Sequence, residues 1–161
     1  YLSKIYNEEW MKEHQYSESE INLYAKDVVA DKRLTGREKK LLMGRPQDTL
    51  LEALRRMRKQ DISQLPVFEG KELIGSIYED DVLTLMLKGR EIKKMIVREA
   101  MGPPLPVISP EARIESIMRL VSPEKPAVLV QSGKGVYDII TKYDILNAVS
   151  RFSTDGRDRR S

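Results

Sequence analysis

The chain has 161 residues, of which 40% are hydrophobic and 33% charged, the balance of a soluble globular protein. Its 28 basic and 25 acidic residues leave a net charge of +3, too small an excess to indicate a nucleic-acid partner. The absence of cysteine and the single histidine, His14, exclude disulfides, thiolate zinc sites, cysteine nucleophiles and multi-histidine metal centres. No segment approaches the roughly 18 consecutive apolar residues of a membrane span, so we expect no membrane partner and a cytoplasmic location.

Residues 1–24 read as a linker that contains an amphipathic helix, with Trp10 and Met11 on its apolar side. The chain opens on Tyr1 and shows no signal peptide, which we interpret as a segment of a longer protein.

The rest of the chain contains an internal repeat. Residues 63–86 align with residues 126–149 at an offset of 63, and residues 45–57 align with residues 109–121 at an offset of 64. The aligned identities include Val67 with Val130, Gly70 with Gly133, Ile77 with Ile140, Asp81 with Asp144, and Leu83 with Leu146. The sequence therefore predicts two copies of a unit of roughly 60 residues, each too small to bury a core alone.

Each copy has the pattern strand, helix, strand, strand, helix. In the first copy these elements are expected at residues 41–43, 50–57 (with Asp48 as N-cap), 64–68, 73–78 and 79–88, with a glycine turn at Gly70. In the second copy they are expected at residues 106–108, 114–118, 127–131, 136–141 and 142–151, with the turn at Gly133. The polar residues 153–161 are expected to form a disordered tail.

The end of the second hairpin strand carries a recognisable phrase. Residues 74–82, IGSIYEDDV, follow the pattern hydrophobic-Gly-x-Ile-x-x-x-Asp-hydrophobic, and residues 137–145, YDIITKYDI, repeat it with Asp138 in place of the glycine. With two copies in register, the chain resembles a tandem CBS domain pair, also called a Bateman module. The resemblance implies an α/β (α+β) fold of two β-α-β-β-α repeats, residues 25–91 and 92–152, packed about a pseudo-two-fold axis. It also implies a homodimer formed through helices, for which Leu85, Met86, Ile114 and Met118 are the expected apolar surface.

The first residues carry a second resemblance. YLSKIYNEEWMKEHQ is similar to the segment that closes the catalytic domain of cystathionine beta-synthase and its bacterial relatives, which use pyridoxal phosphate (PLP). The chain itself shows neither a glycine-rich phosphate cradle nor the context of a Schiff-base lysine, so we expect no catalysis from it. The resemblance implies a non-catalytic module of cysteine biosynthesis, whose partner is the catalytic domain of its own parent chain. A CBS pair from a different host, sensing AMP or ATP, and a structural dimerisation module with empty clefts both remain alternatives.

The resemblance also implies a site for an adenosyl ligand. Thr141-Lys142-Tyr143-Asp144 matches the Thr-x-x-Asp signature of CBS pairs, in which the carboxylate holds the ribose hydroxyls. Carried over, the adenine is expected beside the backbone of Ile62, Ser63, Gln64 and Leu65, with Leu42 and Met43 as an apolar wall. In the first copy Tyr78 replaces the threonine, so that cleft is expected to be empty or occluded.

The identity of the ligand stays open between S-adenosylmethionine, an adenine nucleotide and none. Lys142 and Lys125 favour a phosphate group if they lie near the second-copy cleft. The charge clusters at residues 37–40 and 88–94 are interpreted as solvated surface.

Overall fold

The computed structural model describes residues 22–37, 40–123 and 125–160, with residues 153–160 as backbone alone. The helices are α2 (Ala25–Leu34), α3 (Leu50–Gln60), α4 (Glu79–Leu87), α5 (Val97–Ala100), α6 (Ile114–Leu120) and α7 (Lys142–Arg160). The strands are β1 (Gln64–Glu69), β2 (Glu72–Tyr78), β3 (Val107–Ile108), β4 (Ala127–Gly133) and β5 (Val136–Thr141). The predicted N-terminal helix and His14 lie outside the described residues.

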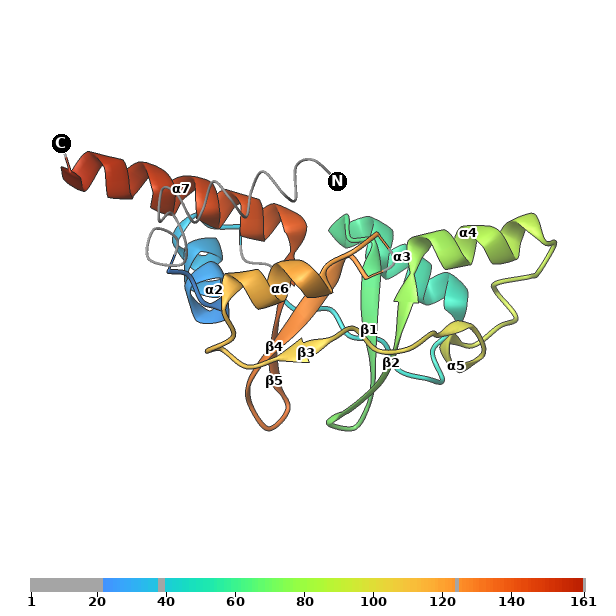
Figure 1. The fold of residues 1–161 in the computed structure, drawn as a ribbon. Helices are drawn as coiled ribbons and strands as arrows, with labels where there is room; N and C mark the ends of the chain where they lie inside the picture. Colours follow the sequence, from blue (N-terminus) through green and yellow to red (C-terminus); the bar gives the residue numbers. More distant parts are fainter. Residues whose placement is uncertain (1–21, 38–39, 124, 161) are drawn as a thin grey trace.

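The two copies form two similar halves that lie side by side in Figure 1. The β1–β2 hairpin pairs Gln64 with Tyr78, and the β4–β5 hairpin pairs Ala127 with Thr141, which are equivalent positions at the offset of 63. In both halves a helix follows the second hairpin strand at once. The predicted mixed fold with two repeated hairpin units is confirmed.

The first predicted strand of each copy is weaker than expected. In the second half β3 runs parallel to β4 and pairs Ile108 with Val130. In the first half residues 41–43 form no strand, and one isolated bridge pairs Gly44 with Val67. Glycine lacks the side chain that packs a strand onto its neighbours, and Gly44 stands where the second copy has Ile108.

Two local predictions were wrong by one or two residues. The N-cap of α3 is Thr49, whose side chain accepts a hydrogen bond from the Glu52 amide, whereas Asp48 accepts from the Arg45 amide one turn earlier. The turn glycine of the second hairpin is Gly135, with φ +73°, and Gly133 is the last residue of β4. Each hairpin turn has two residues, and either one can have the positive φ of the left-handed conformation. In the first hairpin it is the first turn residue, Gly70, and in the second hairpin it is the second turn residue, Gly135.

The end of the chain also differs from the prediction. The backbone of α7 continues as a helix to Arg160, where a disordered tail was expected from residue 153. Helix propagation costs little once a packed first turn exists, and no proline interrupts residues 142–160.

The segment that leads into each copy packs on the other copy. The Ala25 amide donates to the Ala112 carbonyl at 2.8 Å, and the Val97 amide donates to the Asp48 carbonyl at 2.8 Å. In the same way, the Ile114 amide donates to the Leu23 carbonyl and the Leu50 amide to the Met95 carbonyl, each at 2.9 Å. Because Asp48 with Ala112 and Leu50 with Ile114 are related by the offset of 64, α2 and α5 are structural counterparts, exchanged between the halves.

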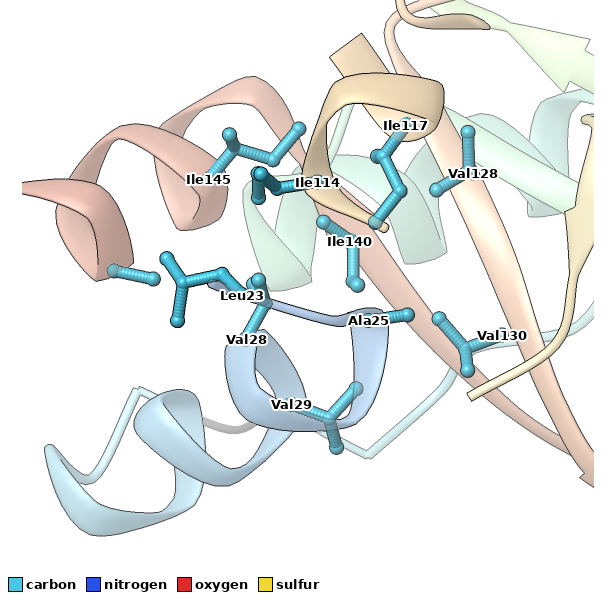
Figure 2. Close-up of a cluster of buried hydrophobic side chains, with 11 residues drawn as sticks. Leu23, Ala25, Val28, Val29, Ile114, Ile117, Val128, Val130, Ile140 and Ile145 are labelled. Carbon is cyan, nitrogen blue, oxygen red and sulfur yellow. The ribbon is translucent and has the colours of Figure 1, made fainter. Parts of the chain in front are cut away.

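This exchange places residues of distant segments in one core. In Figure 2 the side chains of Leu23, Ala25, Val28 and Val29 pack with side chains of α6, β4, β5 and α7. Leu23 precedes α2, and the other three residues belong to it. The first half has a matching core, in which Ile92, Met95 and Val97 pack with side chains of α3, β1, β2 and α4. Residues 23–29 therefore complete the second half, and residues 92–97 complete the first.

A third cluster joins the halves. Leu105, Ala127 and Leu129 are buried there, and Tyr78 and Tyr137 pack against them. The Tyr137 ring lies 5.2 Å from the Phe68 ring, centroid to centroid, so aromatic contact links the two hairpins.

The helix surfaces differ in part from the predicted apolar face. Ile114 is a core residue and Leu85 packs against the first core, whereas Met86 and Met118 are exposed as expected. Leu83, Leu87 and Leu146 add to the exposed apolar surface. In the described part of the chain, no helix combines the length and the apolar character that crossing a bilayer requires.

Candidate functional site

A cavity of about 850 Å³ lies between the two halves, beside the start of α7. Six of the eight predicted site residues line it: Leu42, Ile62, Ser63, Gln64, Thr141 and Asp144. They come from the segment before α3, from the start of β1 and from the β5–α7 junction. The fold thus brings together residues that are about 80 positions apart in the sequence.

The side chains of the other two predicted residues point elsewhere. Leu65 is fully buried in the core of the first half, because neighbouring side chains of a strand face opposite sides, and Gln64 and Pro66 line the cavity instead. Met43 is 46% exposed and is not among the lining residues. The predicted apolar wall therefore consists of Leu42 with Leu41, Val121 and Pro126.

Thr141 and Asp144 are hydrogen-bonded to each other at the start of α7. Asp144 Oδ2 accepts hydrogen bonds from the Thr141 amide at 2.9 Å and from Thr141 Oγ1 at 3.1 Å. The carboxylate also lies in the first helical turn, where negative charge is favourable. Asp144 is only 7% exposed, so its charge depends on nearby partners.

Those partners are two cations from the α2 segment. Lys32 Nζ lies 3.1 Å from Asp144 Oδ2 and donates to the Ile139 carbonyl at 2.8 Å. Arg37 Nη1 lies 3.3 Å from Asp144 Oδ1. The same guanidinium bonds Asp31 through Nη2 at 3.0 Å, and Arg151 Nε reaches the other Asp31 oxygen at 2.7 Å. An ionic network therefore connects α2, the cavity and α7.

Sequence reasoning missed these two residues. Arg37 was interpreted as part of a solvated cluster, and this is corrected by its contact with Asp144 and its place in the cavity wall. One helix face carries Ala25, Val28, Val29 and Lys32. This spacing was a signal that the three apolar residues are buried and that the lysine lies at the end of the same buried face. Only the packing of α2 on the second half shows where that stripe points.

Positive charge predominates around the cavity. Lys32, Arg37, Lys40 and Lys142 line it, against the carboxylates of Asp61 and Asp144. Lys142, as predicted, lies at the second-copy cleft, whereas Lys125 is not a lining residue. The cavity can accommodate a ligand with an apolar ring system and an anionic group.

The equivalent place in the first half is built differently. The Tyr78 ring packs against the cluster that joins the halves, and burial raises the pKa of its phenol above the ordinary 10.0. The next residue, Glu79, forms an ion pair with Arg58 at 2.8 Å. The Tyr78 ring thus belongs to the apolar cluster between the halves, whereas the equivalent Thr141 lines the cavity. Among the described residues, no group of three or more acidic or histidine side chains is placed to hold a metal ion.

Comparison with known proteins identifies one family, in sequence and in structure. A family model described as the CBS domain matches residues 39–88 and 97–151. Solved structures resemble the chain at low sequence identity. A CBS domain-containing protein of unknown function from Bacillus anthracis is 20% identical, with a TM-score of 0.63 and coverage of 80% of this chain and 94% of that one. A CBS-domain containing protein from Agrobacterium tumefaciens is 17% identical, with a TM-score of 0.65 and coverage of 78% and 92%.

A plant protein extends the comparison. CBSX2 from Arabidopsis thaliana is 19% identical, with a TM-score of 0.63 and coverage of 73% of this chain and 92% of that one. A second structure of CBSX2, in complex with AMP, is 21% identical and has a TM-score of 0.58, with coverage of 71% and 91%. The family match extends over most of the sequence and includes both hairpins. The chain therefore belongs to the CBS domain family, as a tandem pair.

Proposed function

We propose that this CBS pair is a non-catalytic regulatory module that binds an adenosyl ligand in the cavity between its halves. The observation that carries the proposal is the convergence of Thr141 and Asp144 with Ile62, Ser63 and Gln64 around one cavity of about 850 Å³. The volume is in the range of small-molecule sites, and apolar walls with a few polar groups are their usual lining. The AMP complex of CBSX2 supports the ligand class.

The test is isothermal titration calorimetry with AMP, ATP and S-adenosylmethionine. We expect at least one to bind with a stoichiometry of one per chain. Asp144→Ala is expected to weaken binding about tenfold or more, and Asp81→Ala, at the equivalent exposed position in α4, to leave it unchanged. Equal losses from both substitutions in folded protein would place the ligand elsewhere.

A second variant separates binding from folding, because Asp144 also has a structural role. Ser63 is exposed and lines the cavity, so Ser63→Trp should fill the site without disturbing a core. The matched control is Ser132→Trp in the β4–β5 hairpin, also exposed and away from the lining. Ligand binding that survives Ser63→Trp would contradict the proposal.

The host enzyme is a further part of the proposal. The segment YLSKIYNEEWMKEHQ supports a parent of the cystathionine beta-synthase type, with PLP in its catalytic domain and S-adenosylmethionine among the candidate ligands. The coding sequence upstream of Tyr1 tests this. A different catalytic or transport domain there would favour a nucleotide sensor of another host.

Assembly into a homodimer through the helices completes the proposal. The exposed apolar side chains of α4, α6 and α7 support it, since a small monomer seldom leaves so many in solvent. If every adenosyl compound fails to bind, the same surface favours the second candidate function, a structural dimerisation module.

A further inference from the structure

We propose that Arg37 determines the charge class of the ligand: it selects an adenosyl compound that carries a phosphate over a neutral or cationic one. This inference rests on the proposed adenosyl site. Arg37 lies outside both segments matched by the family model, residues 39–88 and 97–151, so the family comparison assigns it no role. It reaches the site because the α2 segment packs on the second half.

The first step is a count of acceptor positions on Asp144. A carboxylate offers about four, two on each oxygen. Oδ2 already accepts from the Thr141 amide and Thr141 Oγ1, and it lies 3.1 Å from Lys32 Nζ in an ion pair. Oδ1 accepts from Arg37 Nη1, which leaves about one of the two positions on this oxygen open with respect to the described residues. A ribose diol brings two hydroxyl donors, so it binds Asp144 in full only by displacing Arg37 Nη1.

The second step concerns what the displaced guanidinium does. In the structure its Nη2 is held by Asp31 and its Nε by Thr35 Oγ1 at 2.9 Å, so the planar group can pivot about these two contacts, which moves Nη1 off Asp144 and keeps the group in the cavity wall. Asp31 is 3% exposed and its other oxygen is held by Arg151, which fixes this anchor. Displacement therefore exposes one charged N–H to the ligand without releasing the side chain.

The third step is the choice of ligand. A charged donor left without an acceptor in a partly buried site is unfavourable, and a phosphate oxygen supplies an acceptor of opposite charge. Adenosine has no such group. S-adenosylmethionine has one carboxylate, but its sulfonium and ammonium leave it with a net positive charge beside Lys32, Lys40 and Lys142. The loss of the Arg37–Asp144 contact is thus compensated best by a ligand with a net negative charge.

The first half lacks this device. Its structural counterpart of α2 is α5, which ends at Ala100 and continues as extended chain through Met101. α2 is longer and is followed by Thr35, Gly36 and Arg37, which bring the guanidinium to the cavity. Selection by charge is therefore a property of the cavity beside the start of α7.

The test compares the affinities of AMP, adenosine, S-adenosylmethionine and inorganic phosphate by calorimetry. The variants are Arg37→Gln, Arg37→Lys and Arg55→Gln, the last removing an exposed arginine on α3 that does not line the cavity. In the wild type we expect AMP to bind at least about tenfold more tightly than adenosine. Arg37→Gln should weaken AMP and strengthen adenosine, each about threefold or more, because it removes the phosphate partner and frees Asp144 Oδ1. Arg55→Gln should change neither affinity, and Arg37→Lys should keep the preference for AMP.

These opposite changes distinguish selection from a loss of folding, which would weaken both ligands together. Melting temperatures of all variants provide the check, and the wild-type ratio of AMP to adenosine affinity decides the matter if Arg37→Gln does not fold. Equal binding of AMP and adenosine by the wild type, or an unchanged ratio in Arg37→Gln, would overturn this inference and leave the adenosyl site standing. Inorganic phosphate binding as tightly as AMP, or no binding by any compound, would overturn the adenosyl site and this inference together.

Discussion

Tyr78 and Thr141 occupy the same position in the two hairpins: each is the last residue of the second strand and pairs with the first residue of the first strand, Gln64 or Ala127. The tyrosine ring packs into the cluster between the halves, whereas the threonine hydroxyl bonds Asp144 at the edge of the cavity. Two equivalent positions thus have different surroundings: a tyrosine that packs between the halves and a threonine that lines the cavity.

The pKa of Tyr78 gives a prediction for alkaline pH. Burial raises it, the charge of Asp81 acts in the same direction, and a hydrogen bond with Ser76 partly opposes both. Because the folded-state pKa lies above the unfolded value near 10.0, the stabilising contribution is complete below pH 10 and is lost as the pH rises through the folded pKa. The free energy of unfolding should therefore fall more steeply above pH 10 in the wild type than in Tyr78→Phe. Urea titrations at pH 8, 10 and 11 measure this, and parallel curves would show that the phenol does not contribute.

Asp144→Asn should destabilise the fold. The substitution removes the charge that neutralises Lys32, whose side chain is 12% exposed, and leaves a poorly solvated cation. We expect a loss of about 3 kcal/mol in the free energy of unfolding. Asp81→Asn, exposed at the equivalent position, should cost about 0.3–1 kcal/mol through its helix-terminal charge. Urea unfolding followed by circular dichroism measures both, and similar losses would mean that the ionic network is not stabilising.

Gly75→Ala should also destabilise the protein. A methyl group there would lie 2.8 Å from the Gly102 carbonyl oxygen and 2.8 Å from Met101 Sδ, so the backbone must shift. Overpacking of this kind costs about 1–3 kcal/mol. Gly102→Ala is the matched control, because nothing lies within 4 Å of its added methyl group. Thermal melting that ranks the control below Gly75→Ala would contradict this packing.

The exposed helix surface predicts self-association. Leu83 and Leu87, one turn apart on α4, are 55% and 80% exposed. Sedimentation equilibrium should show a dimer, and the double variant Leu83→Lys with Leu87→Lys should raise its dissociation constant by about tenfold or more. Leu34→Lys, at an equally exposed leucine on α2, should have no effect. A monomeric wild type at all concentrations would contradict the dimer.

Local elements were predictable where side-chain pattern and turn chemistry agree. The hairpin strands at residues 64–68 and 136–141 alternate or run apolar between glycine turns, and the structure has them within one residue. Two features could not be predicted in this way, because each depends on the backbone conformation at a single glycine. They are the position of the second hairpin turn, at Gly135, and the absence of a strand at residues 41–43, where Gly44 forms one isolated bridge. Most of the candidate site followed from the resemblance to CBS pairs, and the repeat contributed only the correspondence between Asp144 and Asp81.

The sequence by itself determined the two copies, their element order and the Thr141–Asp144 pair, since these depend on residues that are close along the chain. The tertiary structure alone decided that α2 packs on the second half and α5 on the first, because that choice depends on apolar contacts between distant segments, such as Val28 with Ile114 and Val97 with Leu50. It also decided the partners of Asp144. Lys32 and Arg37 reach that carboxylate because burial of Val28 and Val29 fixes the helix that carries them, and a buried charge requires a partner of opposite sign.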